Sequence, residues 1–176
     1  MKGYICLILF SFLFSILAVA KQDEPPKIGD SAPEFILQDT EEKLYNLKKL
    51  RGKMVFLIMG NRKIRKEDDK WALAFHNEYK ENEKITAFII GDLRSVPAFI
   101  PKRFVLSQLK KKPPPLPFLL DWKGNIHQAY HTEKKKPNLY LISSEGKLIY
   151  HRKANFSDEN FVELKKKIDT NLKLTP

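Results

Sequence analysis

The chain has 176 residues, of which 43% are hydrophobic and 30% are charged, and its formal net charge is +11. These proportions exclude a disordered chain, and the length suits one domain with a sizeable core. The sequence contains a single cysteine, Cys6, close to the N-terminus. A domain that begins after Cys6 has no thiolate, so it cannot act as a thiol peroxidase or exchange disulfides.

Residues 1–20 have the pattern of a cleavable secretory signal. Lys2 supplies a positive charge, the run Gly3–Leu17 is almost wholly apolar, and Ala18-Val19-Ala20 is a small-residue cleavage motif. We therefore expect cleavage after Ala20 and a secreted or periplasmic protein. An uncleaved membrane anchor is the alternative.

Behind this leader we expect a flexible arm over 21–27, one domain over 28–170 and a short tail over 171–176. Loss of the leader removes one positive charge, Lys2, and no acid, so the net charge falls from +11 to +10. A basic surface favours anionic partners, either a protein or an anionic component of the cell envelope, with peripheral membrane contact. Nucleic acid is not expected as the partner of an exported chain.

The hydrophobic pattern predicts strands that alternate with helices. Continuous apolar runs predict buried strands, and apolar residues at helical spacing predict amphipathic helices. The predicted strands are 35–37, 54–59, 85–90, 118–121, 139–143 and 147–152. The predicted helices are 66–80, 99–111 and a final helix capped by Ser157, with a turn or short helix at 44–50 and a turn at 123–125. This order predicts an α/β fold: a central mixed β-sheet flanked by helices, then a β-hairpin and a C-terminal helix.

Two segments within this pattern carry further expectations. The inward side of the second helix is predicted to be Phe104, Val105, Leu106 and Leu109. The proline-rich segment 113–117 must be extended, and we interpret it as a stiff lead into the next strand. A polyproline ligand for a partner protein is the alternative interpretation.

Four motifs occur in an order that is typical of one protein family. Ile28–Phe35 resembles the entry motif G-x-x-A-P-x-F, and Leu50–Leu57 resembles the L-x-G-K-x-V-x-L lead into the first core strand. Leu120–Asn125 resembles the family's L-D-x-x-G turn, and Pro137–Leu148 resembles its closing hairpin. The chain is thus similar to the thioredoxin-like redoxins of the alkyl hydroperoxide reductase C and thiol-specific antioxidant type. It also resembles, more loosely, the YtfJ-type periplasmic proteins.

The resemblance places the active site of the redoxins at the start of the helix after the first core strand. Asn61 and Ile64 stand at the two positions of the family's C-x-x-C motif, with Arg62 and Lys63 between them. Neither an amide nor an alkyl side chain can form a mixed disulfide or reduce a peroxide. These four residues are therefore interpreted as a relic active site without a catalytic residue.

Arg62, Lys63 and Arg65 surround the expected start of this helix. A helix N-terminus with cationic neighbours can hold an anion, so these residues are a candidate anion site. The alternative is a basic loop that is merely solvated.

Pro137 aligns with the cis-proline that faces the active site in the family, which predicts a cis peptide bond here. In thioredoxins the strand edge beside that proline receives extended polypeptide. The resemblance thus implies a binding groove formed by Asn61, Arg62, Pro137 and Asn138.

His127 and His131 have the i, i+4 spacing of a metal-binding pair, but no third ligand stands at a supporting interval. We expect neither a metal nor a cofactor. The favoured function is a non-catalytic binding or scaffolding protein that uses the relic groove or the basic face. The alternatives are a redoxin oxidoreductase with altered or partner-supplied chemistry, and a peripheral protein bound to anionic envelope surfaces.

Overall fold

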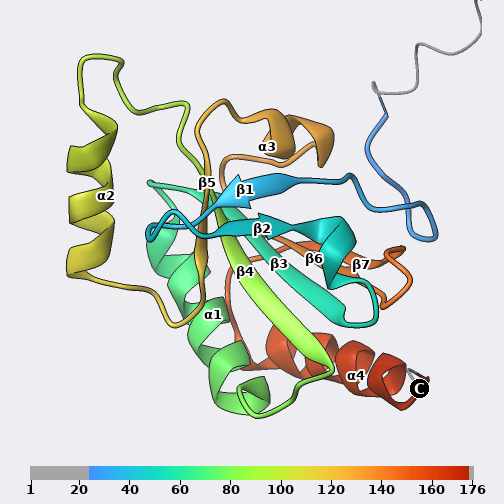
Figure 1. The fold of residues 1–176 in the computed structure, drawn as a ribbon. Helices are drawn as coiled ribbons and strands as arrows, with labels where there is room; N and C mark the ends of the chain where they lie inside the picture. Colours follow the sequence, from blue (N-terminus) through green and yellow to red (C-terminus); the bar gives the residue numbers. More distant parts are fainter. Residues whose placement is uncertain (1–23, 175–176) are drawn as a thin grey trace, which may run out of the picture.

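Five strands form the central sheet of the computed structural model, which describes residues 24–174 (Figure 1). The strand order is β5-β4-β3-β6-β7, and β3, β4 and β5 run parallel to one another. β6 is antiparallel to β3, and β7 is antiparallel to β6. The bounds are β3 Met54–Asn61, β4 Ile85–Asp92, β5 Phe118–Asp121, β6 Asn138–Ile142 and β7 Leu148–Lys153. The predicted mixed sheet with its closing hairpin is confirmed.

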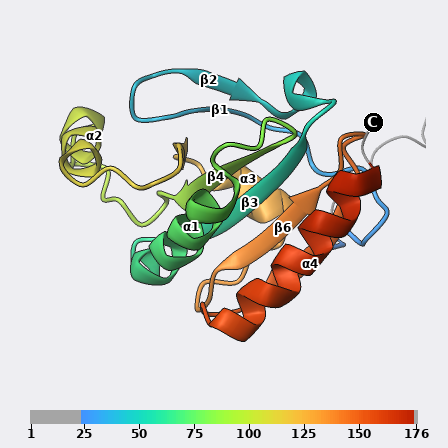
Figure 2. The ribbon, with the colours of Figure 1, turned by 90° about the horizontal axis from the view of Figure 1, so that it is seen from below.

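One face of the sheet is covered by α1 (Arg65–Tyr79) and α4 (Asp158–Leu174), as Figure 2 shows. Met54, Phe56 and Ile58 of β3 point toward this face. They belong to one buried cluster with Trp71 of α1 and Leu164 of α4. Burial of this apolar surface is the main force that holds the two helices to the sheet.

The opposite face is covered by the hairpin of β1 (Ile36–Gln38) and β2 (Leu44–Asn46) and by the short helix α3 (Asn125–Ala129). The alternate residues of β3, among them Leu57, are buried there beside Tyr130. Because β3 is buried on both faces, its sequence is a continuous apolar run rather than an alternating one.

Four sequence expectations about these elements need correction. The segment 44–50 is strand β2 followed by a 3₁₀ helix over Leu47–Leu50, rather than a single turn or helix. The turn at 123–125 continues into α3, which the sequence pattern did not reveal because five residues are too few to show helical periodicity. The final helix extends to Leu174, so residues 171–174 belong to it and not to a tail. The predicted leader over 1–20 lies outside the described residues.

The fourth correction concerns α2 (Lys102–Lys111), which lies beside β5 at one side of the domain (Figure 1). None of its residues is fully buried. Leu106 and Leu109 pack partly against the core, but Phe104, which was expected to face inward, is 53% exposed. The apolar side of α2 thus borders a hollow instead of closing on the core.

Candidate functional site

The site lies at the edge of the sheet where the parallel strands end. Asn61, the last residue of β3, is in register with Asp92, the last residue of β4. Asp92 is in turn in register with Asp121, the last residue of β5. The carboxyl ends of parallel strands are where α/β folds place their ligand-binding residues, and three polar side chains meet at this edge.

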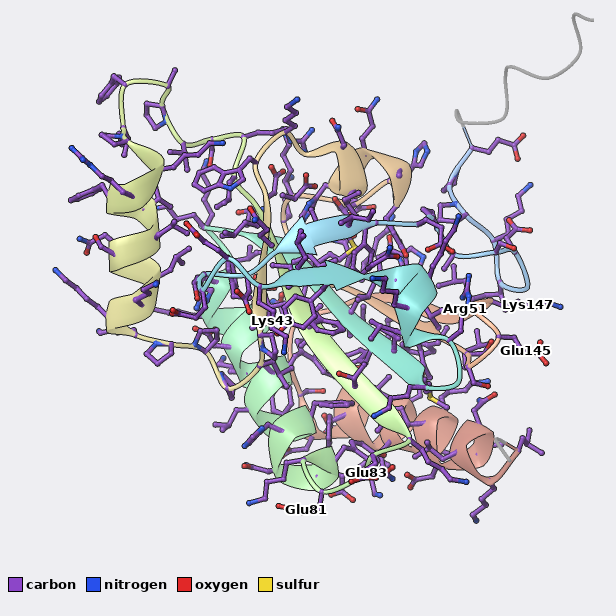
Figure 3. All side chains as sticks on the ribbon, in the orientation of Figure 1. Lys43, Arg51, Glu81, Glu83, Glu145 and Lys147 are labelled. Carbon is purple, nitrogen blue, oxygen red and sulfur yellow. The ribbon has the colours of Figure 1, made fainter. Side chains whose placement is uncertain are left out.

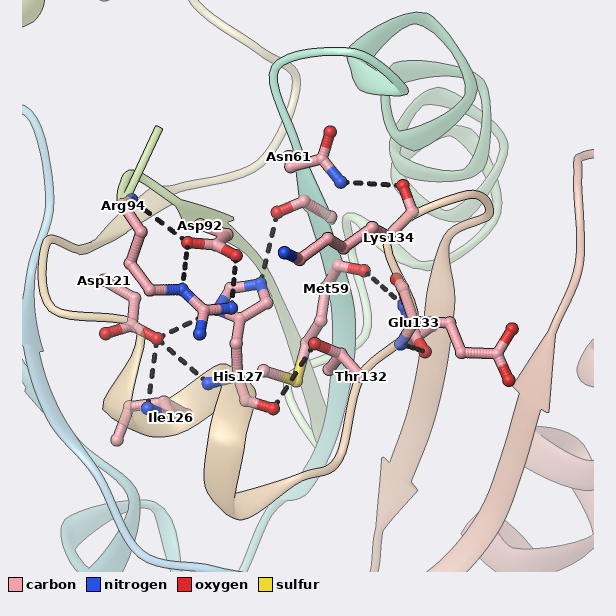
Figure 4. A network of polar contacts seen from close by, with 12 residues as sticks. Met59, Asn61, Asp92, Arg94, Asp121, Ile126, His127, Thr132, Glu133 and Lys134 are labelled. Atoms are coloured by element: carbon pink, nitrogen blue, oxygen red, sulfur yellow. Dashed lines mark hydrogen bonds and ion pairs between the residues drawn. The ribbon is translucent and has the colours of Figure 1, made fainter. Parts of the chain in front are cut away.

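Asn61 joins this edge to the loop before β6 (Figure 4). Its amide nitrogen donates to the carbonyl oxygen of Lys134 at 2.9 Å, and its amide oxygen accepts from the backbone N–H of Lys63 at 2.9 Å. Ile64 precedes α1 as its N-cap and makes no side-chain capping bond. Asn61 and Ile64 therefore lie at the junction of β3 and α1, and neither side chain is a nucleophile.

The residues proposed for anion binding are not arranged alike. Arg62 and Lys63 are exposed in the loop between β3 and α1. Arg65 lies within α1, where its Nε is 2.7 Å from Asp69 and its guanidinium lies 4.6 Å from the ring centroid of Phe118. Arg62 and Lys63 thus remain available at the surface, whereas Arg65 is already engaged by its own chain.

Pro137 and Asn138 differ from expectation. The described residues contain no cis peptide bond, so the bond before Pro137 is trans and the cis prediction is wrong. Both residues are buried and cannot line an open groove with Asn61 and Arg62. The side chain of Asn138 is fully engaged: it accepts from the N–H of Glu133 and donates to the carbonyl oxygen of Met59 and to two carbonyls of its own loop. Asn138 is a structural clamp for the loop.

A buried pair, Asp121 and His127, lies behind the relic site (Figure 4). His127 is 3% exposed; its Nδ1 lies 2.9 Å from Asp121 Oδ2 and its Nε2 lies 3.1 Å from the carbonyl oxygen of Gly60. Both neighbours accept hydrogen bonds, so both contacts are hydrogen bonds only when the ring carries two protons. Burial alone would raise the pKa of Asp121, but its hydrogen bonds from the ring and backbone of His127 lower it. Contacts of the His127 ring with Asp121 on one side and with Gly60 on the other fix the end of β3.

Asp92 extends this arrangement on β4. Its carboxylate accepts two hydrogen bonds from the guanidinium of Arg94, at 2.9 and 2.6 Å. Burial opposes ionisation, yet the bonds from Arg94 and the nearby charge of His127 lower the pKa of Asp92. His127 was considered in the sequence only with His131 as a metal pair. Residues 24–174 contain no group of three or more His, Cys, Asp or Glu placed to hold a metal ion.

A cleft of about 420 Å³ lies between this edge of the sheet and α2. We call it the α2 cleft. Its apolar lining includes Val96, Ile100, Phe104, Val105, Leu109 and Phe118. Asn61 and Arg62 also line it, so the hollow beside the relic site lies toward α2 and not toward Pro137.

Asp68 is among the residues that line the α2 cleft. Asp68 is 1% exposed, and its Oδ1 has no hydrogen-bond partner. Burial raises the pKa of Asp68 to about 8, and the charge of Arg65 offsets only part of this shift. Asp68 did not stand out in the sequence, because an acid in the first turn of a helix is already explained by the helix dipole. The apolar residues that follow at helical spacing, such as Trp71 and Phe75, could have revealed that Asp68 lies on the buried side.

Residues 28–151 match the AhpC/TSA family. The chain belongs to this family. A relative, the thiol-disulfide oxidoreductase ResA of Bacillus thuringiensis subsp. konkukian, is 28% identical over 149 residues, which are 84% of this chain and 82% of that protein. The redoxin resemblance is thereby confirmed.

Solved structures support the thioredoxin-like fold. The putative thiol:disulfide interchange protein DsbE from Chlorobium tepidum has a TM-score of 0.68 at 19% identity, covering 84% of this chain and 99% of that one. A putative protein disulfide isomerase from Bacteroides thetaiotaomicron has a TM-score of 0.66 at 26% identity, covering 84% and 91%. Within residues 24–174 no helix has the length and apolarity to cross a membrane.

Proposed function

We propose that this AhpC/TSA-family protein is a non-catalytic binding protein of an exported compartment. The observation that carries the proposal is Asn61. Relatives of this chain are named as thiol-disulfide oxidoreductases, and here the position that resembles the redoxin motif holds an amide. Both polar atoms of that amide bond to the backbone, at Lys63 and Lys134. The residue has a structural task in place of a chemical one.

The surface that we assign to the partner is a basic rim around Asn61. It consists of Arg62, Lys63, Lys134, Lys135 and Lys136, all of which are exposed. The hydrogen bond from Asn61 to Lys134 holds the two segments of the rim side by side. Clustered exposed cations attract anionic partners, so the rim suits an acidic segment of a protein.

The first test measures peroxide and disulfide turnover by purified Lys21–Pro176, which excludes Cys6, with intact mass recorded on the same sample. We expect no turnover above a heat-treated control, because the domain holds no thiol. Turnover that survives metal chelation would contradict the proposal and favour a redoxin oxidoreductase with non-thiol or partner-supplied chemistry.

The second test uses poly-L-glutamate as an acidic probe. Arg62→Glu with Lys63→Glu should weaken its binding about tenfold or more at low salt, because four units of charge change at the rim. The matched control is Lys53→Glu with Lys80→Glu, which makes the same change before β3 and after α1, away from the relic site. Equal loss in both variants would assign the binding to net charge and not to the rim.

A second candidate function, peripheral attachment to anionic envelope surfaces, is favoured by α2. The segment 99–112 contains five cations and no acid. Phe99 and Phe104 within it are 84% and 53% exposed. A basic helix with exposed aromatic side chains is typical of a segment that lies on an anionic bilayer.

Vesicle binding tests this second function. Vesicles of phosphatidylglycerol should retain the protein at low salt, and vesicles of phosphatidylcholine should not. Phe99→Ser with Phe104→Ser should reduce retention on the vesicles. The variant Arg62→Glu with Lys63→Glu keeps both phenylalanines and measures the contribution of charge alone. Trp122, whose ring lies 5.1 Å from Lys102 Nζ, is a fluorescence reporter beside α2. Equal retention on both lipids would contradict the assignment.

A further inference from the structure

The α2 cleft has a polar group that its own chain leaves without a partner. Asp68 is 1% exposed and its Oδ1 has no hydrogen bond, although buried polar atoms in folded proteins are almost always bonded. Its carboxyl packs against Gly60, where even a Cβ atom would overlap it. The backbone of β3 thus makes room for this carboxyl at the floor of the cleft.

The other charged groups of the lining differ from Asp68. Arg65 pairs with Asp69 at 2.7 Å, and Asp92 pairs with Arg94 at 2.6 Å. Arg62 is exposed at the rim. Within the described lining, Asp68 is therefore the buried charge-bearing group that still requires a donor.

The walls of the cleft set a second requirement for a ligand, in addition to a hydrogen-bond donor for Asp68. Val96, Ile100, Val105 and Leu109 supply aliphatic surface, and Phe118 supplies an aromatic ring. Such walls favour the apolar body of a ligand, whereas a small hydrated ion would leave them in contact with water. The cleft thus combines an apolar wall with one buried carboxyl, the usual arrangement of a small-molecule site.

We propose that the α2 cleft binds a cationic amphiphile, a ligand with a protonated amine on an aliphatic body, and that the amine pairs with the carboxyl of Asp68. The inference rests on the proposed function, since it takes the end of the molecule beside Asn61 as a binding site. A protonated amine donates the missing hydrogen bond. Its positive charge also offsets the cost of burying the ionised carboxylate. The opposite class, an amphiphilic carboxylate held by Arg62, is an outcome of the test.

Proton linkage distinguishes the two classes. The charged groups around Asp68 are Arg65, Glu67 and Asp69 of α1, with Asp92 and Arg62 on the cleft lining; α2 contributes no titratable side chain to it. Burial raises the pKa of Asp68 to about 8, so the free protein holds a proton there at neutral pH. An amine must displace this proton, and its affinity should rise by roughly fiftyfold between pH 6 and pH 8 as the ionised fraction grows.

The experiment is calorimetry of the purified protein with octylamine, octanol and octanoate, at pH 6 and pH 8 and in two buffers of different ionisation enthalpy. Octylamine should bind best, with affinity that rises with pH and a buffer-dependent heat that reports proton release. Asp68→Asn should abolish the pH dependence. Glu81→Gln, which removes an exposed acid just beyond α1 (Figure 3), should leave it unchanged. Val105→Trp should lower the affinity for octylamine by filling the cleft, without a change in the proton release that accompanies binding.

Three results would overturn the inference: preference for octanoate with affinity that falls as pH rises, octylamine binding that Asp68→Asn does not alter, or no binding of any of the three probes. None of these results affects the turnover and poly-L-glutamate tests. A result that contradicts the cationic amphiphile as ligand can therefore be distinguished from one that contradicts the proposed non-catalytic binding function.

Discussion

The Nε2 atom of His127 lies 3.1 Å from the carbonyl oxygen of Gly60, across 67 residues of sequence. This contact connects α3 to Gly60, the residue of β3 that precedes Asn61. On its other side the ring bonds to Asp121, whose Oδ2 also accepts from the N–H groups of Ile126 and His127. The backbone next to Asn61 is therefore held in place by a buried pair of side chains, Asp121 and His127.

Replacement of this histidine should destabilise the whole domain. His127→Ala leaves the carboxylate of Asp121 buried without its ring partner, and removal of one member of a buried pair costs about 3–5 kcal/mol. Urea unfolding measures the loss in the free energy of unfolding. The control is His131→Asn, at a half-buried residue whose φ of 50° Asn tolerates. A loss below about 1 kcal/mol for His127→Ala would show that the pair does not hold the fold.

Stability should respond to pH through Asp68. Its pKa is about 8 in the folded protein against an ordinary 3.8. Between these values the folded state keeps a proton that the unfolded state loses, so this group lowers stability as pH rises, by up to about 1.4 kcal/mol per pH unit. Well below pH 3.8 both states are protonated and the effect vanishes.

Asp68→Asn removes this penalty, so its advantage over the native protein should grow from pH 4.5 to pH 8 and then level off. Thermal unfolding of both proteins across this range measures the difference. Glu81→Gln is the control, and its difference from the native protein should stay flat. An Asp68→Asn difference that is equally flat would mean that the carboxyl ionises normally.

Much of this fold followed from sequence pattern. The run Met54–Met59 indicated a strand buried on both faces, and β3 is buried there throughout. The cleft did not follow, because it depends on how α2 sits beside β5 and no local pattern encodes that distance. Nor did the clamp made by Asn138, since a single buried amide has no periodic signal. Asp68 did not stand out in the sequence for a different reason, because the helix dipole is a sufficient local explanation of an acid in the first turn of a helix.

Gly60 and Asp68 should be coupled. A Cβ at Gly60 would overlap the carboxyl of Asp68, so Gly60→Ala should destabilise by about 1–3 kcal/mol through overpacking. In the Asp68→Ala background that carboxyl is gone, and the same change should be nearly neutral. A double-mutant cycle by urea unfolding gives the interaction free energy. If the losses in the free energy of unfolding of the two single variants simply add in the double variant, the added Cβ does not contact the carboxyl of Asp68.

The relic position can be tested by restoring its chemistry. Asn61→Cys with Ile64→Cys recreates a C-x-x-C motif at the junction of β3 and α1, where a helix N-terminus lowers the pKa of a thiol. We expect the double variant to gain dithiothreitol-dependent reduction of insulin disulfides, and Ile64→Cys alone to stay near background because its domain lacks a second thiol. Loss of the Asn61 amide should cost about 1–2 kcal/mol, since its bonds to Lys63 and Lys134 disappear. A folded double variant without turnover would show that the surroundings, as well as the nucleophile, have departed from redoxin chemistry.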